Sequence, residues 1–164
     1  MDVKPNITAG QCERLLEPLL GRSAGYARAI VGNRADAQDM VQEAALKLWR
    51  SIASFDPRRS FEGWFFAILR NCCRDLLRRR ATQPLCAGID DLPEKTAEAQ
   101  DWEALRSSLG RLSSTHRQIL ELRYFGQCSY REIAGALEIP EGTVMSRLHA
   151  AREALAAAYR LENT

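Results

Sequence analysis

Arginines frame a short polar face on a helix predicted near the end of the chain. Thr143, Ser146, His149 and Ala150 share this face, at about 100° of helix rotation per residue. Arg147 and Arg152 flank it. The expected buried stripe opposite consists of Val144, Leu148, Ala151, Leu155 and Tyr159. Short polar side chains can approach base edges while arginines contact phosphates, so we interpret this face as a DNA-binding surface. An ordinary solvated helix face is the alternative.

The residues before this helix predict a second, shorter helix and a tight turn. Ser129 followed by Glu132 is a capping box, which starts a helix at Tyr130. Pro140 cannot continue that helix and suits the start of the next. The pair predicts a helix-turn-helix, a motif that places its second helix in the major groove but also occurs as a purely structural unit.

A basic helix with aromatic neighbours is predicted far upstream, over residues 61–80. Its expected buried stripe is Phe61, Phe65, Ile68, Leu69, Cys72 and Leu76. The opposite face carries Gly63, Ala67, Arg70 and Arg74, with Asn71 and Arg78 at its margin. Trp64 and Phe66 lie beside the stripe, where they could stack on unpaired bases. This combination favours binding of single-stranded or melted DNA. The alternative, a solvated arginine face over an aromatic core, explains the same residues equally well.

Asp36 is expected to cap a helix that runs to about Ala53. One leucine on this helix points away from the core. The expected inward side chains are Ala37, Met40, Val41, Ala44, Ala45, Leu48 and Ile52. Leu46 instead lies among Asp39, Gln42, Glu43 and Arg50. An apolar centre with a polar rim is typical of a protein-docking point, although a single exposed leucine usually has no role.

The composition restricts the chain to one or two globular domains. Its 164 residues are 46% hydrophobic, which allows a core in each half. No apolar run is long enough to span a bilayer and no secretory signal pattern is present, so we expect a cytoplasmic protein without membrane insertion. Five cysteines without metal-ligand spacing predict reduced thiols and no metal or other cofactor: Cys12, Cys72, Cys73, Cys86 and Cys128.

Charge is segregated along the chain behind a formal net charge of +2. Residues 1–86 hold 14 basic and 9 acidic side chains, a net of +5. Residues 87–104 hold 1 and 6, a net of −5, and residues 105–164 hold 8 and 6, a net of +2. Two cationic blocks around an acidic one indicate two polyanion-binding modules and a linker.

Helical periodicity predicts an all-α protein with two small helical domains joined by a flexible acidic linker. We expect domains at residues 10–82 and 101–161 and the linker at 83–100. Three helices besides those described above are expected: one within residues 12–31, which Pro18 and Gly21 break or restart, one around Trp102, Leu105 and Leu109, and one capped by Ser113 or Ser114 that ends near Gly126.

Three of these segments, in this order, resemble bacterial RNA polymerase sigma factors of the extracytoplasmic-function (ECF) group. They are DAQDMVQEAALKLWR (36–50), FDPRRSFEGWFFAILRNCCRDLLRRR (55–80) and LSSTHRQILELRYFGQCSYREIAGALEIPEGTVMSRLHAAREAL (112–155). The resemblance covers most of the chain outside the first residues, the linker and the tail. It implies a region 2 helical bundle and a region 4 helix-turn-helix, without the extra regions of housekeeping sigma factors.

The resemblance implies a role for three groups of residues. Contact with the clamp helices of the largest polymerase subunit falls on Asp39, Gln42, Glu43, Leu46 and Trp49. Binding of the −10 element, with base capture by the loop 55–60, falls on Phe55, Arg58, Arg59, Ser60, Trp64, Arg70, Asn71 and Arg74. Recognition of the −35 element falls on Arg131, Thr143, Ser146, Arg147, His149 and Arg152.

The implied function is promoter selection rather than catalysis. The chain would bind core RNA polymerase, including its flap, direct it to promoter DNA and promote strand opening. An anti-sigma factor is an expected partner. The acidic linker would thread toward the RNA channel or act only as a flexible tether. Met145 and Ala150 stand where the family often has basic residues, so we expect weaker or altered −35 recognition.

Three other interpretations remain open at this point. A helix-turn-helix regulator with an N-terminal sensor would bind duplex DNA tightly without polymerase, usually as a dimer. A thiol enzyme or sensor would use Cys72 and Cys73, but no nucleophile, base and orienting group accompany them. A sigma-like adaptor would bind an anti-sigma factor but not DNA, and the arginines of residues 61–80 argue against it.

Overall fold

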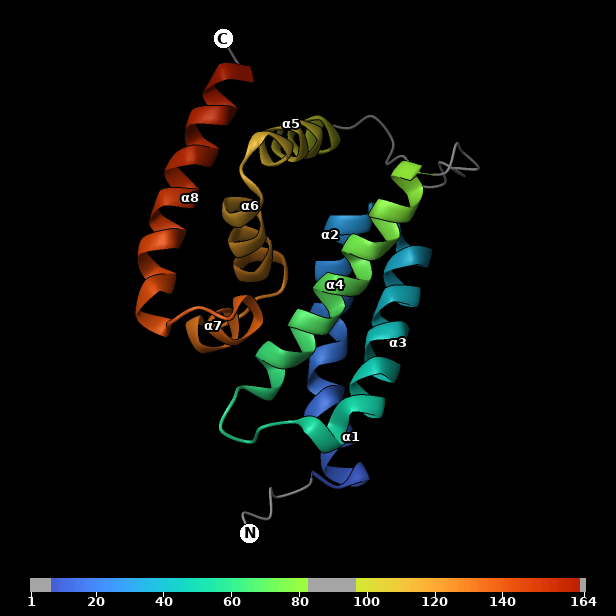
Figure 1. Ribbon diagram of the computed structural model, residues 1–164. Coiled ribbons are helices and arrows are strands. Elements are labelled where there is room, and N and C mark those ends of the chain that lie inside the picture. Colours follow the sequence, from blue (N-terminus) through green and yellow to red (C-terminus); the bar gives the residue numbers. More distant parts are fainter. Residues whose placement is uncertain (1–6, 83–96, 163–164) are drawn as a thin grey trace.

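The computed structural model describes the backbone of residues 7–82 and 97–162, and the elements in these ranges are all helical (Figure 1). The expected all-α fold is confirmed. The first half contains α1 (Ala9–Leu16), η1 (Glu17–Leu19), α2 (Leu20–Val31), α3 (Arg34–Ser51), η2 (Ile52–Ser54) and α4 (Phe61–Thr82). The second half contains α5 (Ala97–Arg111), α6 (Ser114–Leu120), η3 (Glu121–Phe125), α7 (Tyr130–Leu137) and α8 (Glu141–Glu162).

Local signals determine where the helices of the first half begin and end. The short 3₁₀ helix η1 contains Pro18 and interrupts the expected first helix. Gly32, with a φ of 91°, ends α2 in the left-handed conformation that glycine adopts without strain. Asn33 then caps α3, so the prediction that Asp36 caps this helix was wrong. Asp36 lies in the first turn, and its carboxylate pairs instead with Arg80, 2.5 Å away.

In the second half, α5 begins at Ala97, so residues 97–100 of the expected linker are helical, whereas residues 83–96, with Cys86, lie outside the described residues. Ser113 caps α6, which continues as one π-helical turn, η3, up to Gly126. The capping box of Ser129 and Glu132 is present at the start of α7. Glu138 ends α7 with a φ of 55°, and α8 starts directly after Pro140.

The helices form two packed groups that also contact each other. Helices α2, α3 and α4 pack together in the first group, and α8 packs on α5, α6 and α7 in the second. Between the groups, α7 lies against α4 and η3 lies against α2 (Figure 1). The buried side chains of both groups form one continuous core. Nothing in the sequence pattern predicts this contact.

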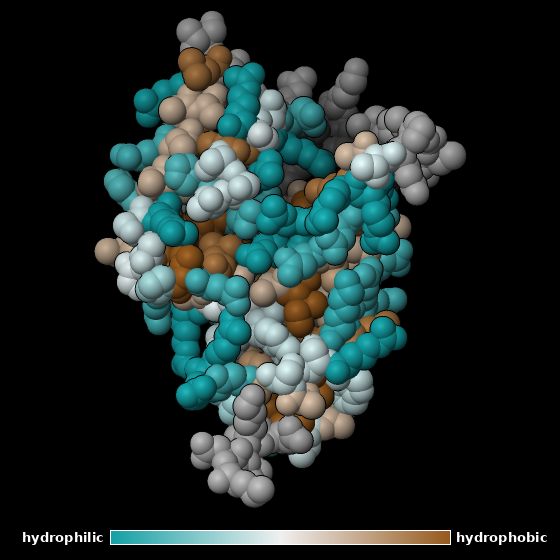
Figure 2. All heavy atoms as spheres, in the orientation of Figure 1, coloured by the Kyte–Doolittle hydropathy of each residue, from teal (hydrophilic) through white to brown (hydrophobic). Residues whose placement is uncertain are grey.

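In Figure 2 polar side chains cover most of the face in view, and the hydrophobic areas between them are small. None of the helices within the described ranges has the length and apolar character that crossing a membrane requires.

Candidate polymerase and promoter surfaces

Helix α3 exposes two large apolar side chains. Leu46 is 58% exposed and Trp49 is 44% exposed, while Leu48 between them is fully buried. Asp39 and Gln42 are exposed on the same helix. The predicted exposure of Leu46 is confirmed, and the surface has an apolar centre with a polar rim.

The side chains expected to face the core of α3 are mostly buried. Ala37, Met40, Val41, Ala44 and Leu48 are buried, whereas Ala45 and Ile52 are only half-buried. Glu43, half-buried, forms an ion pair with Lys47 at 2.8 Å. This pair spans one helical turn at the rim of the exposed apolar surface.

Aromatic side chains hold the loop between α3 and α4 in place. Phe55 is buried, and its ring lies 4.9 Å from that of Trp64 and 5.7 Å from that of Phe61. Ser60 caps α4, since its hydroxyl accepts a hydrogen bond from the Gly63 amide at 3.0 Å. The loop is therefore shaped by its own packing before any DNA arrives.

The two arginines of this loop differ in their partners. Arg58 is exposed and pairs with Asp56 at 2.8 Å within the loop. Arg59 reaches Glu138 at 3.1 Å, in the turn between α7 and α8. The loop thus contacts the helix-turn-helix directly.

Helix α4 uses both of its faces for packing. The expected stripe is buried at Phe61, Phe65, Leu69 and Cys72, but the opposite face meets α7. Arg70 is half-buried and donates from Nη1 to the Ala136 carbonyl at 2.8 Å. Burial lowers the pKa of its guanidinium. On the expected basic face, Arg74 and the marginal Asn71 and Arg78 are exposed, whereas Gly63 is buried and Ala67 is half-buried.

Phe66 was expected beside the stripe, free to stack on bases, and this prediction was wrong. The side chain is fully buried. Its ring meets Tyr26 edge-on at 5.4 Å, and the Arg22 guanidinium lies 5.2 Å from its centre. Phe66 sits where the first half meets η3, so it is a core residue.

The polar face of α8 is open to solvent. Ser146, His149 and Arg152 are exposed, Thr143 and Arg147 are half-buried, and Arg131 is exposed on α7. Val144, Leu148 and Ala151 are buried as expected. Tyr159 is instead 37% exposed, because Ala158 continues the buried stripe in its place. This face of α8 is therefore accessible for binding in a groove of DNA.

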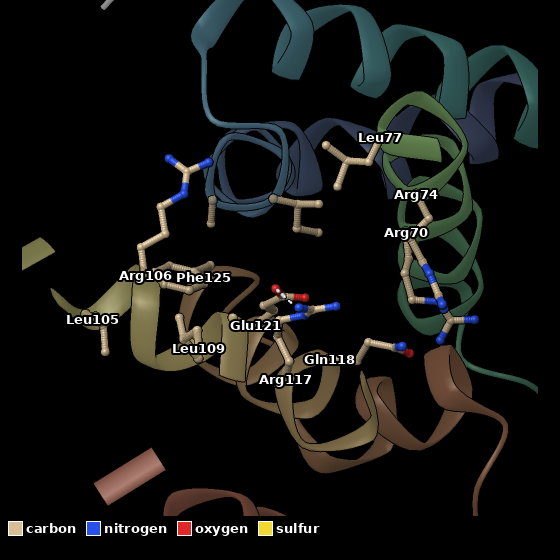
Figure 3. Close-up of a pocket in the computed structure, with 13 residues that line it drawn as sticks. Arg70, Arg74, Leu77, Leu105, Arg106, Leu109, Arg117, Gln118, Glu121 and Phe125 are labelled. Atoms are coloured by element: carbon tan, nitrogen blue, oxygen red, sulfur yellow. Dashed lines mark ion pairs between the residues drawn. The ribbon is translucent and has the colours of Figure 1, made fainter. Parts of the chain in front are cut away.

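A cavity of about 230 Å³ lies between the two halves (Figure 3). Arg70 and Arg74 from α4 and Arg117 from α6 are among its lining residues. Glu121 of η3 points into it, 3.9 Å from Arg117, and burial raises the pKa of this carboxyl to about 7. No pattern in the sequence points to Glu121, because its neighbours come together only when the halves pack.

The cysteines of the described residues are unsuited to thiol chemistry. Cys12, Cys72, Cys73 and Cys128 are buried and unbridged. Burial raises the pKa of Cys73 and of Cys128 to about 12. Thiolates are the reactive form of cysteine, so these side chains are poor nucleophiles at neutral pH.

Both halves of the chain are similar to known protein families. The family model of Sigma-70 region 2 matches residues 15–83, and that of Sigma-70 region 4 matches residues 102–155. The ECF RNA polymerase sigma factor SigL of Mycobacterium tuberculosis is 33% identical over 138 residues, which cover 79% of this chain and 78% of SigL. The chain belongs to the ECF RNA polymerase sigma factors. SigW of Bacillus subtilis, another ECF sigma factor, is 29% identical over 145 residues, or 77% of this chain and 76% of SigW.

Two solved structures have the same fold. CnrH, in complex with the cytosolic domain of CnrY, superposes with a TM-score of 0.67 at 27% identity, covering 92% of this chain and 88% of CnrH. RpoE of Bartonella quintana, in complex with the anti-sigma factor NepR, superposes with a TM-score of 0.65 at 23% identity, covering 90% and 96%. As an ECF sigma factor, the chain binds core RNA polymerase and directs it to promoter DNA.

Proposed function

We propose that this sigma factor divides its work among three surfaces. Helix α3 docks on the clamp helices of the polymerase, the loop 55–60 and α4 bind the −10 element, and α8 reads the −35 element. The observation that supports the docking role most strongly is the exposure of both Leu46 and Trp49 on α3. Exposed apolar side chains with a polar rim suit a protein partner better than they suit solvent.

At the −10 element, the protein holds bases out of the stack. Unstacking costs a few kcal/mol per step, and contacts to the displaced strand offset it. Exposed cations on the loop and on α4, including Arg58 and Arg74, are placed to pair with phosphates. Trp64 is half-buried against Phe55, so one side of the aromatic cluster can meet a base.

At the −35 element, α8 enters the major groove with Ser146 and His149 toward the bases. The two DNA-binding units occupy residues 10–82 and 101–161, with the segment 83–100 between them. Each contact is small, and tethering raises the effective concentration of the second once the first has formed. The chain acts as a specificity factor in the cytoplasm, at the nucleoid when bound to polymerase, and is not itself an enzyme.

We also propose that an anti-sigma factor controls the chain. The structures of CnrH and RpoE that resemble it are complexes with CnrY and with the anti-sigma factor NepR, respectively. A protein that covers the exposed apolar surface of α3 would prevent polymerase binding.

The docking role of α3 is tested by Leu46→Asp in a pull-down with purified core polymerase. A charge in the centre of an apolar contact should reduce association at least about 30-fold, since hot-spot losses reach 2 kcal/mol or more. Leu161→Asp is the matched control, because Leu161 is 75% exposed at the far end of α8. Normal association of the Leu46 variant, with its helical circular dichroism intact, would remove α3 from the docking surface.

A further inference from the structure

The cavity between the two halves is lined by more positive than negative side chains (Figure 3). Four arginines and one acidic residue are among the described residues that line it: Arg70, Arg74, Arg106, Arg117 and Glu121. Helix α4 supplies two of the arginines, and α5 and α6 supply one each. Arg106 lies at one end, where a Cβ on Gly32 would be 2.6 Å from its Nη2. One carboxyl group cannot neutralise the other arginines.

Two of these arginines lie next to each other on α4. Arg70 donates from Nη1 to the Ala136 carbonyl at 2.8 Å, but its Nε is buried and has no hydrogen-bond partner among the described residues. Arg74 is exposed, and Figure 3 marks no ion pair between it and the other residues drawn. Burial, and also the positive charge of Arg74, lower the pKa of the Arg70 guanidinium. The two like charges lack an acidic partner in the cavity.

The third arginine, Arg117 of α6, has only a distant partner. It lies 3.9 Å from Glu121, which is longer than a hydrogen bond. The Glu121 side chain is 13% exposed, and burial raises the pKa of its carboxyl to about 7. About half of these carboxyl groups are therefore neutral at pH 7. The N–H donors of Arg117 remain available to another acceptor.

The remaining lining and the size of the cavity restrict its ligand. Apolar side chains, among them Ile30, Leu109 and Phe125, lower the local dielectric constant and strengthen charge interactions. Guanidinium groups match the oxygens of phosphate, and a phosphate group carries about −1.5 to −2 charges where a carboxylate carries one. The volume of about 230 Å³ is below the roughly 300–1,000 Å³ of pockets for drug-sized ligands. A small, multiply charged anion therefore fits best.

We propose that this cavity is a binding site for a small phosphate anion of the size of inorganic diphosphate, held by Arg70 and Arg74 of α4 and by Arg117 of α6. The anion neutralises the neighbouring arginines and accepts hydrogen bonds from donors that have no acceptor among the described residues. Glu121 opposes it whenever its carboxyl is ionised. Because both halves supply contacts, the anion binds the folded chain and raises its melting temperature.

The test is calorimetric titration of the full chain with inorganic diphosphate, at neutral pH and physiological salt without magnesium. Wild type should bind saturably with a Kd below about 1 mM. Arg74→Gln should weaken binding at least about tenfold, since it removes a charge-assisted contact. The matched control is Arg78→Gln, which removes an exposed charge one turn along α4 and outside the cavity, and should change the Kd less than about twofold. No saturable binding, or equal weakening by both variants, overturns the proposal.

A second pair of variants tests the contribution of the other half. Arg117→Gln should weaken diphosphate binding at least about tenfold, whereas Glu121→Gln should strengthen it, because the opposing carboxylate is gone. Glu103→Gln makes the same charge change on the exposed surface of α5 and should leave the affinity unchanged. Circular dichroism identifies any variant that fails to fold, and the variants on the other helices then decide. Wild-type affinity in both folded Arg117→Gln and folded Glu121→Gln contradicts the assignment.

A nucleic-acid backbone is the other source of phosphate groups, and a fluorescent oligothymidylate distinguishes the two. Arg70 and Arg74 are also proposed to contact −10 DNA, whereas Arg117 is not. Arg117→Gln should therefore lose diphosphate binding and keep the wild-type affinity for the oligonucleotide. Oligonucleotide binding that depends on Arg117, with no binding of diphosphate, would assign the cavity to nucleic acid and overturn the proposal.

Discussion

At the contact between the halves, some residues are closely packed, and some buried polar groups lack a hydrogen-bond partner among the described residues. Gly63 lies on the face of α4 that was expected to bind single-stranded or melted DNA. The structure places α7 there instead. A glycine indicates that something approaches closely but does not identify it.

Substitution of Gly63 by Ala should destabilise the protein. The added Cβ meets backbone atoms at 2.6 and 3.1 Å, which cannot move independently. Overpacking of this kind costs about 1–3 kcal/mol. Gly21→Ala is the control, because a Cβ there meets nothing within 4 Å and should be neutral or stabilising. Urea denaturation compares the two, and a stabilised Gly63→Ala would contradict the packing described.

The Tyr26 hydroxyl is buried without a hydrogen-bond partner among the described residues. Burial also raises the pKa of this phenol. Tyr26→Phe keeps the edge-on contact with Phe66 and removes an unsatisfied group, so stability should stay equal or rise by about 1 kcal/mol. Thermal melts of this variant and of Tyr124→Phe, which changes an exposed ring, provide the measurement. A loss of more than about 1 kcal/mol would reveal a partner for the hydroxyl.

Glu121 should make stability depend on pH. Its folded pKa of about 7 lies above the ordinary value of 4.5, because burial outweighs the attraction of Arg117 and Arg74. The folded state therefore binds the proton more tightly, so the stabilisation is complete below pH 4.5 and is lost as pH rises to about 7. Wild type should lose up to about 3 kcal/mol relative to Glu121→Gln across this range. A parallel pH profile of the two proteins, with exposed Glu103→Gln as control, would contradict this.

Whole elements show why helix prediction succeeded where surface prediction did not. Periodicity located the buried stripes of α3, α4 and α8, and the capping box located the start of α7. Periodicity identifies only the main apolar stripe of each helix, so every other face is predicted to be exposed to solvent. Helix α4 is packed on two faces, and its second neighbour comes from residues far along the chain.

Helix α4 should be required for strand opening but not for polymerase binding. Replacement of both Arg70 and Arg74 by Ala removes one cation bound to α7 and one exposed cation, while the α3 surface is untouched. Permanganate footprinting on a promoter selected from a random library should show no melted bubble, with polymerase association unchanged. A normal bubble would exclude these two residues from strand separation.

Helix α8 should determine the upstream sequence preference. Ser146→Ala or His149→Ala changes an exposed side chain on the proposed base-reading face, and each good base contact is worth about 1–3 kcal/mol of discrimination. Promoter-library selection should shift at −35 positions while transcription from a premelted template stays the same. An unchanged preference in both variants would place base recognition elsewhere on α8.

At the scale of the whole molecule, the sequence was sufficient for the family and the helical class but not for the arrangement of the halves. The motifs that carry the resemblance are local, and the family comparison confirmed them. The ion pair between Arg22 and Glu132 joins residues 110 positions apart. No spacing rule connects such residues, because their proximity depends on how the two helix groups pack against each other.

The account depends on the chain giving core RNA polymerase a promoter preference. Run-off transcription from a random promoter library measures this directly, with core polymerase alone, with wild type added and with Leu46→Asp added. We predict selective initiation with wild type only, at promoters that share one upstream and one downstream element. Initiation no more selective with wild type than with core polymerase alone would contradict the account.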